Sequence, residues 1–321
     1  MTQEPSLPLA LIVAGPTASG KSALALELAE ILGGVVINAD SMQVYRELRI
    51  LTARPSPAEE ARVPHALFGV RSAADPASAG WWRREALAAM DRAQAALRIP
   101  ILCGGTGLYL TALIEGLAEL PPVPEDFRKE AKALLAALGP AGLHAKLAAV
   151  DPDTAARLHP TDSQRITRAW EVWRGTGTGL AAWQARAAAV PAPWRFVAIL
   201  LDPPRPSLHA AITARFAGML RAGAVEEVQA LLALGLDPTL PAMRAHGIAE
   251  LSAFLSGRIS LAEAAGRAVL ATCQYAKRQA TWFRHHRLGS QVYNIHVRFE
   301  QDQQNSRRML ADLLNFLRQS G

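Results

Sequence analysis

The sequence predicts an α/β fold in which helices flank a parallel sheet and a helical lobe interrupts the chain. Apolar, strand-like runs alternate with helical patterns up to residue 120, whereas residues 121–194 carry only helical patterns separated by Gly and Pro. A further strand-like run at 196–201 returns the chain to the sheet. We therefore expect a core domain of residues 1–120 and 195–321 and an inserted helical lobe of residues 121–194.

The stretch between the first strand and the first helix fits the phosphate-loop pattern G-x-x-x-x-G-K-[ST] at every fixed position. It follows the apolar run 9–14 and opens a helical pattern with apolar residues on one face, namely Leu24, Leu28, Ile31 and Leu32. Strand, loop and helix thus come in the order that the motif requires. We therefore expect a P-loop NTPase-like parallel sheet.

This loop is suited to a di- or triphosphate. Glycines let backbone N–H groups approach the phosphate closely at the positive end of a helix. Lys21 adds a mobile positive charge, and the Ser22 hydroxyl can bind a magnesium ion that shields the phosphate oxygens. We therefore predict magnesium (Mg2+) as the cofactor, with Ser22 as its ligand. The predicted phosphate-binding residues are Gly15, Pro16, Thr17, Ala18, Ser19, Gly20, Lys21 and Ser22.

Composition and charge narrow the class of protein. Of 321 residues, 50% are hydrophobic and 19% are charged, which describes a globular protein with a sizeable core. No apolar run approaches the roughly 20 residues of a membrane span and no signal sequence begins the chain, so we expect a cytoplasmic protein with no membrane partner. Two cysteines are too few for a structural zinc site. The net charge of +6 suits a polyanionic partner.

A second predicted strand, 35–37, leads to a carboxylate. Asp40 follows this strand, and ligands of open parallel sheets bind at the carboxyl ends of the strands. We therefore expect Asp40 to face the same cleft as Lys21, although an N-cap for the next segment explains it equally well. Residues 41–80 are predicted to form a short helix and an irregular loop over the cleft.

A third predicted strand, 99–103, follows a helical pattern over 81–98 and ends in a second glycine turn at 104–107. Glycines allow this turn to lie against a ligand, to which Thr106 could donate a hydrogen bond. A tight connection between the strand and the helix that begins at Leu108 accounts for the same glycines.

The inserted lobe has two clear helix starts. Asp151 before Pro152 is expected to be an N-cap. A second helix begins near Asp162 and brings polar residues onto one face. These residues are Gln164, Arg165 and Arg168.

After the fourth strand the chain returns to helices. Two are predicted over 207–221 and 225–234, and the first carries Arg215, for which a solvated surface position is the default. The capping box Ser260–Glu263 begins a helix that runs to about residue 286. Its five basic residues, single acid and interleaved aromatic rings favour nucleic acid over an ordinary solvated face.

With these motifs placed, the chain resembles the bacterial tRNA dimethylallyltransferases, also called tRNA isopentenyltransferases, along nearly its whole length. Six motifs come in the family's order, and the chain departs from the family pattern at Leu51, Phe68, Gly69, His246 and Cys273. The motifs are Gly15–Ser22, Asp40–Arg46, Gly104–Tyr109, His159–Arg168, Arg215–Leu220 and Ala276–Trp282.

The resemblance implies transfer of a dimethylallyl group from dimethylallyl diphosphate to the exocyclic N6 amine of the adenosine 3′-adjacent to the anticodon of tRNA. It implies that Lys21, Thr106 and Arg215 contact the diphosphate and that Asp40 accepts the proton of the amine. The implied tRNA contacts are Asp40, Ser41, Met42, Gln43, Thr106, Arg128, Gln164, Arg165, Ile166, Thr167 and Arg168. The partners are then tRNA, through its anticodon stem-loop, and dimethylallyl diphosphate, and a monomer is expected.

Two other functions use the same residues. A small-molecule or nucleoside kinase would bind a nucleotide in the loop and use Asp40 as the base for a hydroxyl. A non-catalytic RNA-binding protein would use the loop as a nucleotide switch.

Overall fold

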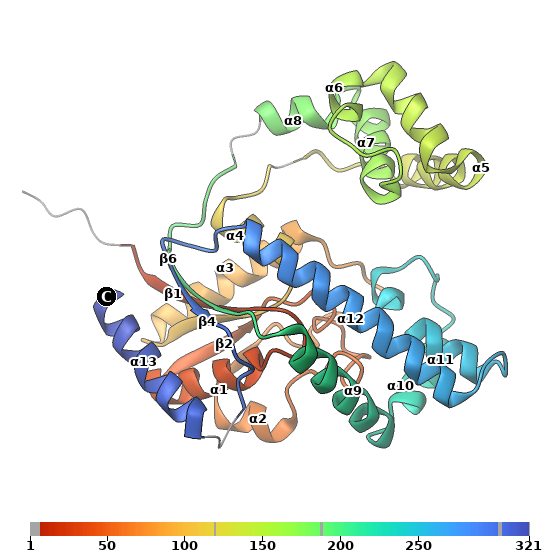
Figure 1. Cartoon of the computed structure of the whole chain (residues 1–321). Helices are drawn as coiled ribbons and strands as arrows, with labels where there is room; N and C mark the ends of the chain where they lie inside the picture. Colours follow the sequence, from red (N-terminus) through yellow and green to blue (C-terminus); the bar gives the residue numbers. More distant parts are fainter. Residues whose placement is uncertain (1–6, 119, 187–188, 301–303, 321) are drawn as a thin grey trace, which may run out of the picture. The chain divides into compact units, whose positions relative to one another are not determined.

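The computed structural model describes residues 7–118, 120–186, 189–300 and 304–320 (Figure 1). The chain forms two compact units. The core unit comprises Met1–Ile114 and Ala192–Gly321, and the helical unit comprises Glu115–Pro191. The helical unit thus begins and ends a few residues earlier than the sequence patterns place it.

The core unit is built on a six-stranded parallel sheet with strand order β3-β2-β4-β1-β5-β6. Central β1 pairs with both β4 and β5, so that Val13 lies opposite Cys103 on one side and Ile199 on the other. β3 was not predicted, since a strand of two residues shows no periodic pattern. The strands are β1 (Leu9–Ala14), β2 (Gly34–Asn38), β3 (His65–Ala66), β4 (Ile99–Gly104), β5 (Arg195–Leu201) and β6 (Gln291–Ile295).

Helices cover both faces of this sheet (Figure 1). Alternate residues of β1 point to opposite faces, with Ile12 in one hydrophobic cluster and Val13 in the other, which is why the strand reads as continuously apolar. One face packs against α1 (Lys21–Leu32) and α13 (Gln304–Ser320). The other packs against α3 (Ala79–Ala95), α4 (Gly107–Ile114), α9 (Arg205–Arg221), α10 (Ala224–Ala233), α11 (Ile248–Leu255) and α12 (Leu261–His285). Two short helices complete the unit, α2 (Pro57–Arg62) and the 3-10 helix η1 (Pro241–Arg244).

The buried face of α1 matches the predicted one only in part. Leu24 and Leu28 are fully buried, as expected, but Ile31 is 48% exposed. Ala25 and Ala29 are buried instead, because the small side chains let the helix lie close to the sheet.

The helical unit consists of α5 (Glu125–Val150), α6 (Pro152–Ala155), α7 (Ser163–Thr176) and α8 (Leu180–Arg186). Both predicted caps are confirmed: the carboxylate of Asp151 accepts from the Thr154 N–H, and that of Asp162 accepts from the Arg165 N–H. Each satisfies an N–H group that the first turn of a helix leaves unpaired.

Among the described residues, only α5 has the length and composition of a membrane span, which corrects the expectation that no segment comes near one. Gly139, with a φ of 67°, and Pro140 break α5 into two arms. Each arm is shorter than the roughly 20 residues that a bilayer requires. Part of the apolar surface of α5 packs instead inside the helical unit, where Leu143 and Leu147 are fully buried.

Candidate active site

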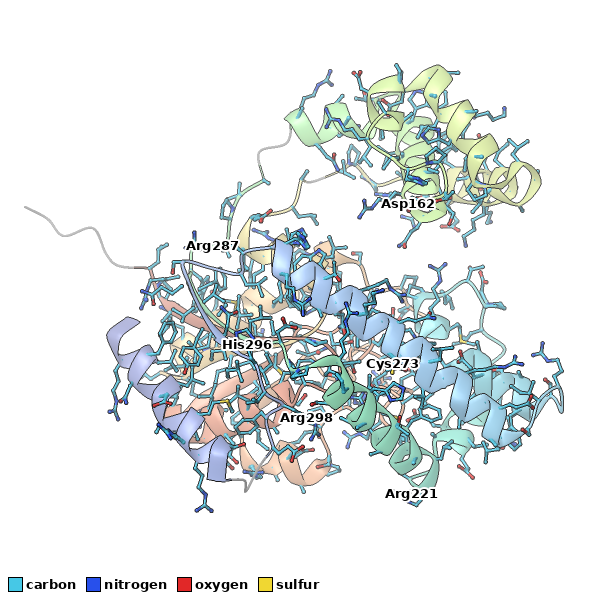
Figure 2. All side chains as sticks on the ribbon, in the orientation of Figure 1. Asp162, Arg221, Cys273, Arg287, His296 and Arg298 are labelled. Carbon is cyan, nitrogen blue, oxygen red and sulfur yellow. The ribbon has the colours of Figure 1, made fainter. Side chains whose placement is uncertain are left out.

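Two positions of the phosphate loop, Gly15 and Gly20, have no room for a side chain. A Cβ on Gly15 would lie 2.5 Å from the Leu201 carbonyl oxygen, and one on Gly20 would lie 2.2 Å from that of Phe299. Gly20 also has a φ of 93°, in the left-handed region. The loop is thus held between β5 and the segment after β6, on which Arg298 lies (Figure 2). Arg298 Nε donates to the Ala18 carbonyl oxygen at 3.0 Å.

Lys21 and Ser22 begin α1 directly after the loop. Burial lowers the pKa of the Lys21 ammonium and the charge of Arg215 lowers it further, while the charge of Asp40 raises it. Lys21 Nζ lies 3.4 Å from the Pro16 carbonyl oxygen. Burial also raises the pKa of the Cys103 thiol to about 11, so this cysteine is a neutral neighbour of the loop at pH 7.

The donor set is consistent with a magnesium ion held mainly by its substrate. Among the described residues, no three His, Cys, Asp or Glu side chains cluster as metal ligands. Ser22 is exposed at the first turn of α1 and offers a single hydroxyl. Magnesium typically takes one or two protein ligands and completes its shell with phosphates and water, which fits this position.

Arg215 reaches the phosphate loop from α9. Its Nη2 donates to the Thr17 hydroxyl at 2.6 Å. Burial lowers the pKa of the guanidinium, the charge of Asp40 raises it and that of Arg298 lowers it further, although an arginine stays protonated in proteins. The default expectation of a solvated arginine is therefore wrong.

Asp40 is held in place by the buried side chain of Asn38. Asn38 Oδ1 accepts from the Asp40 N–H at 2.8 Å, and Asn38 Nδ2 donates to the Asp40 carbonyl oxygen at 2.9 Å. Asp40 Oδ1 accepts from the Met42 N–H at 2.9 Å, which closes a turn rather than capping a helix. The next helix, α2, begins only at Pro57. The helix-cap explanation of Asp40 is therefore wrong.

The second glycine turn packs directly against the end of β2. A Cβ on Gly104 would lie 2.1 Å from the Ala39 carbonyl, so the glycine permits contact between two backbones. Thr106 Oγ1 accepts from the Ser41 N–H at 2.9 Å. The turn therefore connects the loop after β4 to the residue that follows Asp40.

These loops border a cavity of about 250 Å³. Five predicted site residues line it: Thr17, Asp40, Ser41, Met42 and Arg215. Lys21 and Thr106 are not among its described lining residues. One part of the lining is apolar, formed by Leu51, Ile212, Phe216, Met219 and Ala245. The remaining lining residues are Thr52, Arg244, His246, Thr272 and Tyr275. Leu51 and His246, two of the departures from the family pattern, thus face the cavity.

His246 and Tyr275 were not predicted as site residues. Their rings lie 4.8 Å apart between centroids. Burial, followed by the charge of Arg278, lowers the pKa of His246, and burial raises the pKa of Tyr275. Both rings are therefore uncharged at pH 7, and the charged residues that line the cavity are Asp40, Arg215 and Arg244.

The loop that carries Ser41 and Met42 is secured at two points. Gln43 Nε2 donates to the carbonyl oxygens of Thr52 and Ala53, so this predicted tRNA contact is engaged within its own loop. The carboxylate of Glu227, on α10, accepts from three consecutive N–H groups at 2.7 to 2.9 Å. These belong to Arg49, Ile50 and Leu51.

The remaining predicted tRNA contacts belong to the helical unit. Arg165 is 75% exposed and lies 3.5 Å from Asp162, and Arg168 pairs with Glu171 at 3.2 Å. Gln164 is exposed and Arg128 pairs with Glu125. Thr167 donates to the Ser163 carbonyl oxygen. Ile166 is fully buried beside Trp170, so its side chain is packed inside the unit rather than available to a ligand.

The basic helix α12 is exposed along much of its charged face. Arg267, Lys277 and Arg278 are exposed. Arg287, which follows the helix, is exposed as well (Figure 2). The fifth basic residue, Arg284, pairs with Asp202 at 2.9 Å and is partly neutralised.

Two family models match the chain. The model described as IPP transferase matches residues 43–286, and the model described as isopentenyl transferase matches residues 8–66. A tRNA dimethylallyltransferase of Granulibacter bethesdensis is 60% identical over 311 residues, which cover 96% of this chain and 98% of that protein. Another, of Acidiphilium cryptum, is 54% identical over 98% of this chain and 95% of that protein.

Solved structures of related enzymes have the same fold as this chain. The tRNA isopentenylpyrophosphate transferase of Bacillus halodurans is 31% identical, with a TM-score of 0.68, and the match covers 97% of this chain and 95% of that one. A eukaryotic dimethylallyltransferase studied while acting on tRNA has a TM-score of 0.78 at 24% identity, over 97% of this chain and 80% of that one. The predicted P-loop-like α/β fold is confirmed.

Proposed function

The chain belongs to the IPP transferase family, and we propose that it transfers a dimethylallyl group from dimethylallyl diphosphate to the N6 amine of the adenosine 3′-adjacent to the anticodon of tRNA, releasing diphosphate. One observation carries the assignment of roles: a single cavity joins the Thr17–Arg215 contact to the carboxylate of Asp40. Membership of this family decides against the kinase and the nucleotide switch.

The phosphate loop binds the diphosphate of the prenyl donor. An allylic C–O bond breaks readily once the charge of the leaving group is stabilised, and fixed donors and cations provide that stabilisation. Arg215 and Lys21 supply the cations, and Thr106 supplies a hydroxyl from the second turn. Ser22 would hold a magnesium ion, which adds shielding of the diphosphate oxygens when it is bound.

Asp40 accepts the proton. As the adenine amine bonds to C1 of the prenyl group, the C–O electron pair leaves with the diphosphate and the amine loses one proton. Asn38 fixes the backbone of Asp40 on both sides, and the Met42 N–H fixes one carboxylate oxygen. The base is thereby oriented before the substrate arrives, which is the condition for efficient proton transfer.

The adenine has to leave its stack to reach a cavity, so the enzyme binds a flipped nucleotide. Ser41, Met42 and the backbone of the Gln43 loop face that nucleotide in the core unit. In the helical unit the polar residues of α7 and Arg128 contact the tRNA, while Ile166 anchors α7 from inside. We further propose that the enzyme acts in the cytoplasm, as a monomer without a membrane partner.

The test is mass spectrometry of nucleosides from unmodified tRNA that has been incubated with the protein, magnesium and dimethylallyl diphosphate. We expect one adenosine per tRNA to gain the mass of a dimethylallyl group. Fragments should place it directly 3′ of the anticodon. Product at another position, or labelled phosphate transferred from ATP to an alcohol without any prenylation, would contradict the proposal.

A further inference from the structure

Gln279, on α12, connects the two glycine turns of the active site. Its Oε1 accepts from the Thr17 N–H of the phosphate loop at 2.8 Å, and its Nε2 donates to the Gly105 carbonyl oxygen of the second turn at 2.8 Å. The side chain is only 5% exposed. Tyr275 lies one turn earlier on the same helix, and the Gln279 amide acts to lower the pKa of its hydroxyl, against the larger effect of burial.

The amide of Gln279 packs directly against Gly105. A Cβ on Gly105 would lie 2.2 Å from Gln279 Nε2 and 3.3 Å from the Gly15 carbonyl oxygen. Because Gly105 has no side chain, the Gln279 amide can occupy the space beside it. A buried amide costs free energy unless both its oxygen and its nitrogen find partners, and here both do.

The two turns that Gln279 joins contact different parts of the proposed site. The phosphate loop is proposed to bind the diphosphate, and the turn at 104–107 lies beside the segment that holds the proton acceptor. Thr17 also accepts a hydrogen bond from Arg215, which stands at the diphosphate end of the cavity. Gly105 precedes Thr106, whose hydroxyl accepts from the Ser41 N–H beside Asp40. A continuous series of hydrogen bonds and peptide bonds thus runs from the cation that faces the leaving group to the segment that holds the proton acceptor.

We propose that Gln279 is a positioning residue, which sets the distance between the phosphate loop and the turn at 104–107 so that the prenyl donor and the adenine amine meet. The inference rests on the proposed prenyl transfer. Both bonds require an acceptor and a donor on the same carbon, which a neutral primary amide provides without a change of protonation. While the Thr17 N–H is held by Gln279, it is not a donor to phosphate, so Thr17 contributes its hydroxyl and its position.

Gln279→Met keeps the length of the side chain and removes both hydrogen bonds. Misplacement of reacting groups by about 1 Å can cost about a hundredfold in rate, so we expect the single-turnover rate to fall by roughly ten- to a hundredfold. The dissociation constants for dimethylallyl diphosphate and tRNA should each change by less than about threefold, because neither substrate is bound by Gln279. A single-turnover rate within about threefold of the parent would overturn the positioning role. So would a loss of donor affinity large enough to explain the whole fall in rate.

The variant Gln279→Glu should show a pH-dependent rate, which would not be expected if Gln279 only filled space. A carboxylate can accept from Thr17 but cannot donate to Gly105, whereas a protonated carboxyl can do both. The rate of this variant relative to the parent should therefore rise as the pH is lowered from about 8 to about 5.5, toward the range where a glutamate takes up its proton. Using the ratio cancels the pH dependence that both proteins share. A ratio that stays flat would contradict the donated hydrogen bond.

The matched control is Gln274→Glu, the same chemical change on the same helix at an exposed position. It should leave the rate at saturating substrates and its pH profile unchanged. Amide exchange separates this inference from the proposed function: Gln279→Met should accelerate exchange of the Thr17 N–H, and Gln274→Met should not. Unchanged exchange at Thr17 would refute the link between the turns, whereas absence of prenylation by the parent protein would refute the proposed function alone.

Discussion

Arg215 of α9 donates a hydrogen bond of 2.6 Å to the hydroxyl of Thr17 in the phosphate loop. The two residues are 198 positions apart, so the fold itself brings this cation to the loop. The charge of Asp40 acts on both Arg215 and Lys21 and favours their protonated forms. Two cations thus lie near the carboxylate of Asp40, and the net positive charge of these three groups suits the binding of a diphosphate.

Replacement of Lys21 by Ala should weaken binding of dimethylallyl diphosphate by more than about tenfold, or about 1.4 kcal/mol, because the loop loses one of these two cations. Isothermal titration with the donor measures the effect. The affinity for tRNA should stay close to that of the parent, since the proposed RNA contacts use other residues. Lys146→Ala removes an exposed charge in the helical unit and should not alter donor binding. An equal loss of tRNA affinity in Lys21→Ala would show that the two sites are not separable.

The predicted regular elements followed from local patterns. The strand at 9–14, the glycine turns and the capping box at Ser260 are each encoded within a few residues, and all three are confirmed. Asn38 also carried a local signal, because it is a polar residue at the end of an otherwise apolar strand.

The contacts that complete the site carry no such signal. Gln279 lies within the family motif Ala276–Trp282, but its partners are 262 and 174 positions away, so the chain around it does not show what it contacts. Glu227 was missed for the same reason, since its three partners lie more than 170 residues earlier. Ile166 was grouped with its polar neighbours, whereas helical periodicity turns its side chain into the core of the helical unit.

Glu227→Ala should release the loop that carries Ser41 and Met42. Hydrogen bonds to a charged group contribute roughly 1.5 to 3 kcal/mol each, so we expect the free energy of unfolding to fall by about 2 kcal/mol or more. Limited trypsin digestion should cut faster at Arg46, Arg49 or Arg54, which lie in the released loop. The neighbouring Glu226→Ala removes an exposed carboxylate and should leave digestion unchanged. Equal digestion rates for the two variants would refute the anchoring role of Glu227.

The double substitution Arg165→Ala with Arg168→Ala should flatten the dependence of tRNA affinity on salt. Each phosphate contact that is lost reduces the counterions released on binding, and so lowers the slope of log affinity against log salt by somewhat less than one. Filter binding over a salt series measures this slope. The control is Arg307→Ala with Arg308→Ala, which removes the same charge from exposed positions on α13. Identical slopes for both double variants would mean that net charge, not the face of α7, determines RNA binding.

The most direct test of the proton-acceptor assignment is the single-turnover rate of Asp40→Asn. Asparagine keeps the oxygen that accepts from the Met42 N–H, so the turn at Asp40 should survive while the basic group is lost. A positioned base typically contributes about a hundred- to ten-thousandfold, and we expect the rate of prenylation at saturating substrates to fall by roughly that factor. Both dissociation constants should stay near those of the parent. A rate within about threefold of the parent would contradict the account, because the Asp40 carboxylate would then serve only to close a turn.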